Sequence, residues 1–191
     1  MRVLIAEDEA LIRMDLREML VEEGHEVVGE ARNGAEAIEL ARELVPDVVF
    51  MDVKMPDVDG IEAAGVISDE HIAPVVMVTA FSQQAYVEKA SAAGAMAYLV
   101  KPFAKHDVLP AMTIAVTRFA EARALEAEVD DLSDRLETRR ALDRAKGVLM
   151  AKGMTEPEAF KRLQKLAMDR RMSLKQVSEA IIIAAEADGG L

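Results

Sequence analysis

The stretch VVFMD at residues 48–52 decides the fold of this chain. Its four consecutive apolar residues predict a strand that is buried on both faces, as in a parallel sheet covered by helices. Asp52 follows directly, and residues 54–60 (KMPDVDG) are rich in turn formers. A carboxylate at the carboxyl end of a buried parallel strand lies where open α/β sheets bind their ligands. We therefore interpret Asp52 as a residue that is chemically modified, not as a structural acid.

Four further segments are predicted to be strands; three are apolar runs, and the one at residues 27–31 is more mixed in polarity, as an edge strand would be. They lie at residues 3–6, 27–31, 75–78 and 97–100, and segments with apolar residues on one helical face separate them. Such alternation predicts a parallel sheet with right-handed crossovers and helices on both faces. We therefore predict an α/β fold with a doubly wound, five-stranded parallel sheet.

Residues that favour helix ends punctuate the segments between the strands. Gly24 is suited to a left-handed cap, Asn33 to a helix start, and Pro46 to a helix end. A further helix is predicted to open at Ser82 and to close at Gly94. These positions support the alternation of strand and helix.

Polar residues follow four of the five predicted strands. Glu7 and Asp8 follow the first strand, Asp52 ends the third, Thr79 ends the fourth and Lys101 follows the fifth. The carboxyl ends of parallel strands share one edge, so we expect these side chains to meet. Three carboxylates in one cleft repel each other unless a cation neutralises them, and hard oxygen ligands suit Mg²⁺. With Lys101 as a fixed positive charge, they predict phosphoryl transfer to Asp52 as the nucleophile.

The composition excludes several classes of protein. The chain has 191 residues, of which 51% are apolar, and this length suits one large domain or two small ones. It has no cysteine, and therefore no disulfide or thiolate metal site. No run of 18 apolar residues and no leader before the first strand is found. We therefore expect a cytoplasmic protein that does not interact with the membrane.

The net charge of −12 is distributed unevenly. Residues 1–120 carry 10 basic and 21 acidic side chains, residues 121–137 carry 2 and 7, and residues 138–191 carry 11 and 7. The distribution predicts an acidic domain at 1–120, an acidic connector at 121–137 and a basic domain at 138–191. The acidic parts are expected to repel nucleic acid or to shield the basic domain.

The connector has the spacing of a coiled coil. No helix breaker occurs between Pro110 and Gly147, and apolar residues at 122, 125, 129, 132 and 136 follow a 3-4-3-4 spacing. We predict a homodimer through this seam. The alternative is one amphipathic helix packed on its own chain.

The last part of the chain predicts a small bundle of three short helices. One helix is expected to reach about Ala151, and capping boxes at 155–158 and 173–176 start two more. We expect four methionines to fill the core of this bundle: Met150, Met154, Met168 and Met172.

A set of motifs lies at the ends of the predicted strands within residues 1–120: Glu7-Asp8, Asp52 with Met55-Pro56 and Asp59-Gly60, Thr79-Ala80, and Tyr98 with Lys101-Pro102. Together they resemble the receiver domain of two-component response regulators. The resemblance implies a flavodoxin-like sheet in strand order 2-1-3-4-5 and a phosphoacceptor, Asp52, that receives its phosphoryl group from a sensor histidine kinase. It implies no enzyme activity beyond slow self-dephosphorylation.

The same resemblance implies a Mg²⁺ site and a switch. Thr79 and Tyr98 would form the switch pair, and the Lys101-Pro102 peptide bond would be cis. Glu7 stands where many receivers have a second aspartate, which leaves open whether it binds Mg²⁺ directly or through water. The implied Mg²⁺ ligands are Asp8, Asp52, Glu7 and the backbone carbonyl of Lys54.

Three stretches stand out in the C-terminal part: DRAKGVLM at 143–150, GMTEPEAF at 153–160 and AMDRR at 167–171. They resemble a second family, the ANTAR domain, a three-helix module that binds RNA, and the resemblance spans about residues 132–187. It implies binding of paired stem-loops in nascent transcripts and transcription antitermination. The net positive charge supports phosphate binding independently. The candidate RNA contacts are Arg139, Arg140, Arg144, Lys146, Arg162, Lys165, Arg170, Arg171 and Lys175.

Two other outputs remain open from the sequence. The tail helices could form a helix-turn-helix with Arg170 and Arg171 near the recognition helix, which would make the chain a DNA-binding response regulator. Alternatively, the tail could be a protein-interaction module that sequesters a partner. An enzymatic output domain is not expected, because residues 138–191 show no acid/base pair or glycine loop.

Overall fold

The computed structural model describes residues 1–80 and 93–188. The chain forms two compact units, Met1–Arg123 and Ala124–Leu191. The helix predicted between Ser82 and Gly94 falls almost wholly outside the described residues. The domain boundaries at residues 120 and 137 stay predictions.

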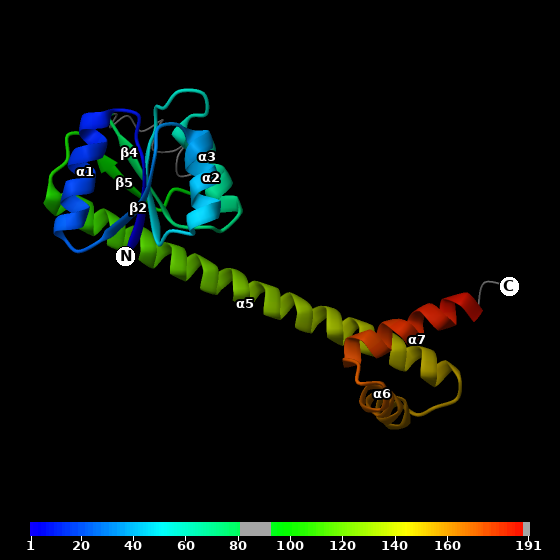
Figure 1. Ribbon diagram of the computed structural model, residues 1–191. Coiled ribbons are helices and arrows are strands. Elements are labelled where there is room, and N and C mark those ends of the chain that lie inside the picture. Colours follow the sequence, from blue (N-terminus) through cyan, green and yellow to red (C-terminus); the bar gives the residue numbers. More distant parts are fainter. Residues whose placement is uncertain (81–92, 189–191) are drawn as a thin grey trace. The chain divides into compact units, whose positions relative to one another are not determined.

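The first unit is built on a five-stranded sheet in which all neighbouring strands are parallel (Figure 1). The strand order is β2-β1-β3-β4-β5, with β3 at the centre. This confirms the predicted doubly wound α/β fold and its order 2-1-3-4-5. The strands are β1 (Arg2–Ala6), β2 (Glu26–Ala31), β3 (Val48–Asp52), β4 (Val75–Thr79) and β5 (Ala97–Val100).

Helices cover both faces of this sheet (Figure 1). On β3, Val49 and Met51 join the core beneath α2 and α3, whereas Val48 and Phe50 join the core that contains residues of α1 and α5. Every residue of β3 is buried, because successive side chains point to opposite, covered faces. The helices of this unit are α1 (Ala10–Glu22), α2 (Gly34–Leu44), α3 (Gly60–Asp69) and the first part of α5 (Lys105–Ala151).

The predicted helix ends are present at two positions. The Asn33 side chain accepts a hydrogen bond from the backbone N–H of Glu36 at 2.8 Å and thereby caps α2. Gly24, after α1, has a φ of +79°, the left-handed conformation expected of a capping glycine. These caps set where the chain turns back toward the sheet.

The second unit is a bundle formed by the C-terminal part of α5 with α6 (Glu156–Arg170) and α7 (Leu174–Asp188). Its fully buried residues include Ala145, Ala159 and Leu163. The first helix of the bundle ends at Ala151, as predicted, but it is the end of the 47-residue helix α5 and not a separate short helix, because α5 continues through Gly147. A single glycine costs a helix only about 1 kcal/mol relative to alanine, so it does not end this one.

The predicted methionine core is wrong for two of its four members. Met150 is 46% exposed and Met168 is 80% exposed, whereas Met154 and Met172 are half-buried at the core. Alanines, namely Ala145 and Ala159, occupy the centre of the bundle instead. Small residues at this position let the helices approach closely and leave no space for additional long side chains.

The seam residues Leu125, Val129, Leu132 and Leu136 are each at least 50% exposed on α5. None of them belongs to the core that α5 shares with α6 and α7. A homodimer through this seam stays a prediction. No described helix combines the length and the apolar character that crossing a membrane requires.

Candidate functional site

The carboxyl ends of the strands form a cavity of about 290 Å³. Parallel pairing places the ends of β3, β4 and β5 beside one another, as expected. Four of the five polar residues predicted at this edge line the cavity, and the fifth, Glu7, is buried and bonded to one of them. The lining residues are Asp8, Glu9, Asp52, Val53, Lys54, Thr79, Ala80 and Lys101.

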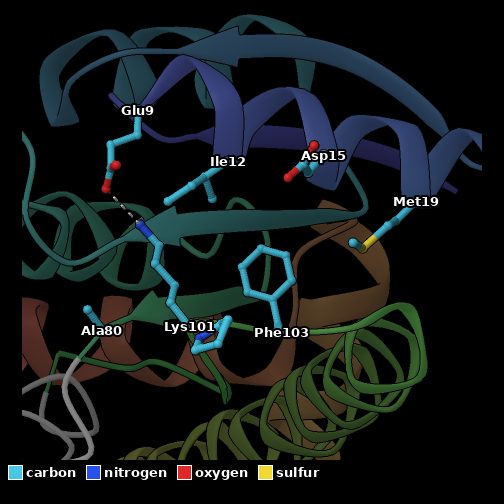
Figure 2. Close-up of a pocket in the computed structure, with 8 residues that line it drawn as sticks. Glu9, Ile12, Asp15, Met19, Ala80, Lys101 and Phe103 are labelled. Carbon is cyan, nitrogen blue, oxygen red and sulfur yellow. Dashed lines mark ion pairs between the residues drawn. The ribbon is translucent and has the colours of Figure 1, made fainter.

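Lys101 is the centre of this site. Its ammonium nitrogen Nζ lies 2.7 Å from Oε2 of Glu7 and 2.7 Å from Oδ1 of Asp52. A longer contact of 3.9 Å reaches Oε1 of Glu9, as Figure 2 shows. The two contacts at 2.7 Å are charge-assisted hydrogen bonds, which are stronger than hydrogen bonds between neutral groups. One cation therefore holds two buried carboxylates from different strands.

Burial sets the protonation chemistry of these groups. Burial raises the pKa of Asp52 and of Glu7, and the hydrogen bonds from Lys101 offset this only in part. Burial alone would lower the pKa of Lys101, but its hydrogen bonds to Asp52 and Glu7 outweigh that, so its pKa is raised. Lys101 is therefore charged at neutral pH, while burial keeps the pKa of both carboxyl groups above its ordinary value.

The carboxylates fit a hard cation. Oxygen atoms of Glu7, Asp8 and Asp52 all lie within 4.8 Å of one another. Asp8 is exposed, so the cluster is open to solvent on one side. An oxygen-only donor set with an open side is the type of site that Mg²⁺ occupies while it keeps several waters. The donor set thus agrees with the predicted metal.

The buried carboxylates predict a stability that depends on pH. Because the folded pKa values are raised above the ordinary 3.8 of Asp52 and 4.5 of Glu7, the folded state releases these protons at higher pH. The free energy of unfolding therefore falls as pH rises through this window. In Mg²⁺-free buffer, Asp52→Asn should be more stable than the wild type at pH 7, on the order of 1 kcal/mol, and the difference should shrink as the pH falls below the ordinary pKa of 3.8, where Asp52 is protonated in both states.

Urea unfolding of both proteins at about pH 3 and at pH 7 measures this difference. Asp57→Asn, in the exposed part of the same loop, is the matched control and should change stability little. A loss of stability at pH 7 in Asp52→Asn would show that the Lys101 contact outweighs burial.

The loop after β3 is held tightly against Asp52. The backbone N–H of Lys54 donates to Oδ2 of Asp52 at 2.9 Å, and the N–H of Gly60 donates to the carbonyl of Val53 at 3.0 Å. A Cβ atom on Gly60 would lie only 1.8 Å from the Asp52 carbonyl oxygen. The glycine is thus required for the close approach of this loop to the end of β3. The Lys54 carbonyl as a metal ligand stays a prediction.

Arg13 is a positioning residue that the sequence reasoning missed. Its guanidinium donates to the backbone carbonyls of Glu7 at 2.6 Å and Asp8 at 3.4 Å. It also donates to the carboxylate of Glu30 at 3.1 Å. The sequence does contain a sign of this role, because Arg13 lies three residues before Leu16 and therefore on the buried face of α1. Arg13 fixes the backbone from which the acidic pair projects.

A second cavity of about 360 Å³ adjoins the first and shares Glu9, Ala80 and Lys101 with it. In Figure 2, Ile12 and Met19 of α1 lie across this cavity from Phe103. The Lys101-Pro102 peptide bond is cis, as the receiver resemblance implies. Glu9, which lines both cavities, was not predicted as a site residue.

The two predicted switch residues lie in different surroundings. Thr79 is buried and lines the first cavity. Tyr98 is half-buried and packs against the core beneath α2 and α3. Thr79 lies on β4 and Tyr98 on the neighbouring strand β5. In the register of these strands, Thr79 pairs with Val100 and Tyr98 pairs with Met77.

The nine predicted RNA contacts are not gathered at one point. Three of them are held in ion pairs within the second unit. For the other six, the described residues offer no carboxylate within ion-pair distance. The ion pairs join Lys175 to Asp134 and Glu137, Lys146 to Asp143 and Glu156, and Arg144 to Glu186.

Comparison with known sequences agrees with this geometry. The family profile of the response regulator receiver domain matches residues 3–113. This chain belongs to the response regulator family. The profile of the ANTAR domain matches residues 130–182 of this response regulator, so both resemblances are confirmed. The transcriptional regulatory protein PdtaR of Mycobacterium tuberculosis is 62% identical over 182 residues, which cover 95% of this chain and 89% of PdtaR.

Solved receiver structures match the first unit of this response regulator. The response regulator domain of Thermotoga maritima CheB is 32% identical, with a TM-score of 0.57, and the match covers 61% of this chain and 96% of that one. A chain of the CheX–CheY–BeF₃–Mg²⁺ complex from Borrelia burgdorferi is 27% identical, with a TM-score of 0.57 and coverage of 61% and 88%. These similarities confirm the receiver fold.

Proposed function

We propose that this response regulator accepts a phosphoryl group on Asp52 from a sensor histidine kinase and thereby controls RNA binding by its ANTAR domain. The observation that supports this most directly is the buried Asp52 carboxylate, held at 2.7 Å by Lys101 within a cluster of three carboxylates. The receiver family implies the kinase, and the ANTAR family implies the RNA.

The residues at the strand ends have complementary roles in this proposal. Asp52 is the nucleophile that attacks the phosphorus, and Lys101 stabilises the negative charge that develops on the phosphoryl oxygens. Glu7, Asp8, Asp52 and the Lys54 carbonyl would hold Mg²⁺, which supplies further positive charge there. The similarity to a chain crystallised with BeF₃ and Mg²⁺ supports this metal. The protein acts as a signalling acceptor and not as an enzyme on a separate substrate.

The signal is proposed to pass from the cavity to the output through a switch and a helix. A phosphoryl group on Asp52 would draw the Thr79 hydroxyl inward, and Tyr98 on the neighbouring strand would follow. Helix α5 begins in the receiver unit and continues into the ANTAR unit, so it offers a continuous covalent path. We also propose that two copies of the chain form a homodimer through the exposed apolar residues of α5 at 125, 129, 132 and 136.

The proposed output is antitermination through RNA stem-loops. The tail has the net positive charge that phosphate binding requires, on a chain that is otherwise acidic. Antitermination is the regulatory outcome that the ANTAR resemblance implies, and the similarity to a transcriptional regulatory protein supports it.

A competition experiment tests the class of output. A labelled hairpin RNA bound to the full chain is challenged with unlabelled hairpin RNA or with duplex DNA of the same sequence. Hairpin RNA should displace the probe at concentrations at least tenfold lower than duplex DNA, because single-stranded loops expose bases that a duplex stacks away. Equal displacement by duplex DNA would favour a DNA-binding regulator. No binding of either would favour a protein-interaction module.

A further inference from the structure

The ANTAR unit contains a groove of about 360 Å³ between α5 and α7. This volume suits one nucleotide or a group of similar size, and it lies outside the receiver site. The groove is distinct in composition, because it combines apolar, cationic and anionic side chains. Its lining residues are Glu137, Arg140, Ala141, Arg144, Glu179, Ile182 and Ile183.

Each wall of the groove offers a different chemistry. Ile183 contributes a large aliphatic surface that is 66% exposed, beside the half-buried Ile182. On α5, Arg140 and Arg144 are four residues apart and therefore lie one turn apart on the same face. Glu179 faces them from α7 with an exposed carboxylate. The groove thus has an apolar floor between hydrogen-bond donors and an acceptor.

Ion pairs hold the two helices together at both ends of this groove. Near the start of α7, Lys175 lies 2.8 Å from Asp134 and 2.7 Å from Glu137 of α5. Near its end, Glu186 lies 3.4 Å from Arg144. The lysine contacts are strong enough to raise the pKa of Lys175 well above its ordinary value. Leu142 of α5 also shares an apolar core with Val177 and Ile181 of α7, so packing as well as the ion pairs joins the two walls of the groove without a ligand.

We propose that this groove binds one unpaired base from the loop of a hairpin RNA. The proposal rests on the proposed RNA-binding function and names a subsite within it. The base would lie on the aliphatic surface of Ile183, its acceptor atoms would face the arginines, and its N–H groups would face Glu179. Sequence-specific RNA recognition commonly uses such splayed loop bases.

The mixture of charges selects this ligand over a phosphate alone. A phosphate would be attracted by Arg140 and Arg144 but repelled by Glu179, and it would leave the floor of the groove unused. The edge of a base carries both donors and acceptors, and its ring covers an apolar surface. A base inside a duplex cannot enter without the cost of unstacking.

The test uses the full chain after phosphorylation with acetyl phosphate and Mg²⁺, and a hairpin RNA that this phosphorylated wild type selects from a library with a randomised loop. Ile183→Ala should weaken binding about fivefold or more, because it removes most of the apolar surface that the base would bury. Its salt dependence should not change, because no charge is removed. Met168→Ala, which removes an 80%-exposed apolar side chain from α6, is the matched control and should bind as the wild type does.

Replacement of each loop nucleotide by an abasic unit completes the test. For one loop position, the abasic hairpin should bind wild type and Ile183→Ala equally, because the contact is already lost. Two results would overturn the groove proposal without affecting the proposed RNA function. In the first, Ile183→Ala binds more weakly than the wild type by the same factor on every abasic hairpin. In the second, Ile183→Ala and Met168→Ala bind the intact hairpin with equal affinity. Failure of the wild type to bind any hairpin would overturn the proposed RNA function together with it.

Discussion

Replacing Asp52 by asparagine is expected to abolish phosphorylation of this response regulator. Asparagine keeps the size of the side chain but removes the anionic oxygen that attacks phosphorus and that Lys101 holds at 2.7 Å. Intact-mass spectrometry after incubation with acetyl phosphate and Mg²⁺ measures the phosphoryl group directly. Wild type should gain one phosphoryl group, and Asp52→Asn should gain none.

The control for this prediction is another acid in the same loop. Asp57 is exposed, whereas Asp52 is buried at the end of β3, so Asp57→Asn changes the charge of the loop equally without touching the cavity. Asp57→Asn should be phosphorylated at the wild-type rate. Phosphorylation that persists in Asp52→Asn would assign the acceptor to a different residue.

Replacing Gly60 by alanine should disrupt both the fold and the site. The new Cβ atom would lie 1.8 Å from the Asp52 carbonyl oxygen and 2.8 Å from its carbon, far inside contact distance. The loop would have to move away from β3 and would lose the 3.0 Å hydrogen bond from the Gly60 N–H to Val53. We expect a loss of about 3 kcal/mol or more in the free energy of unfolding, together with much slower phosphorylation.

Gly65 provides a matched glycine on the same helix. A Cβ atom there has no other atom within 4 Å, so Gly65→Ala should add up to about 1 kcal/mol of stability through helix propensity. Urea unfolding of both variants measures the contrast. If Gly60→Ala were as stable as Gly65→Ala, the close approach of the loop to β3 would be wrong.

The fold of the receiver unit could be predicted because its signals are local. The four apolar residues before Asp52 are buried on both faces, and β1 and β4 repeat this pattern, whereas the edge strands β2 and β5 are only partly buried. In a parallel sheet, strand ends necessarily meet at one edge, so the approach of Lys101 to Asp52 followed from the topology. The alternation of strand and helix was therefore enough to predict which polar side chains meet at the site.

Contacts that depend on side-chain packing were not predictable in the same way. The guanidinium of Arg13 binds two backbone carbonyls, and a sequence does not show where such carbonyls point. The exposure of Met150 and Met168 depends on how closely α5, α6 and α7 approach, which small residues such as Ala145 determine. The continuity of α5 likewise depends on a glycine that the helix tolerates.

The basic residues of the tail show a similar limit. Charge along the sequence predicted nine equivalent phosphate contacts, but intramolecular acids occupy some of them. Lys175, for example, is held by Asp134 and Glu137, two acids of the predicted connector. Net charge therefore indicates the kind of ligand, whereas ion pairs decide which cations are available to it.

The central claim is that phosphorylation of Asp52 controls RNA binding. The most direct measurement is the affinity of the full chain for hairpin RNA at fixed salt, with and without acetyl phosphate, in wild type and in Asp52→Asn. The proposed function predicts that phosphorylation tightens RNA binding by the wild type and leaves Asp52→Asn unchanged. Equal affinity of phosphorylated and unphosphorylated wild type, with the phosphoryl group confirmed on Asp52 by mass spectrometry, would contradict it.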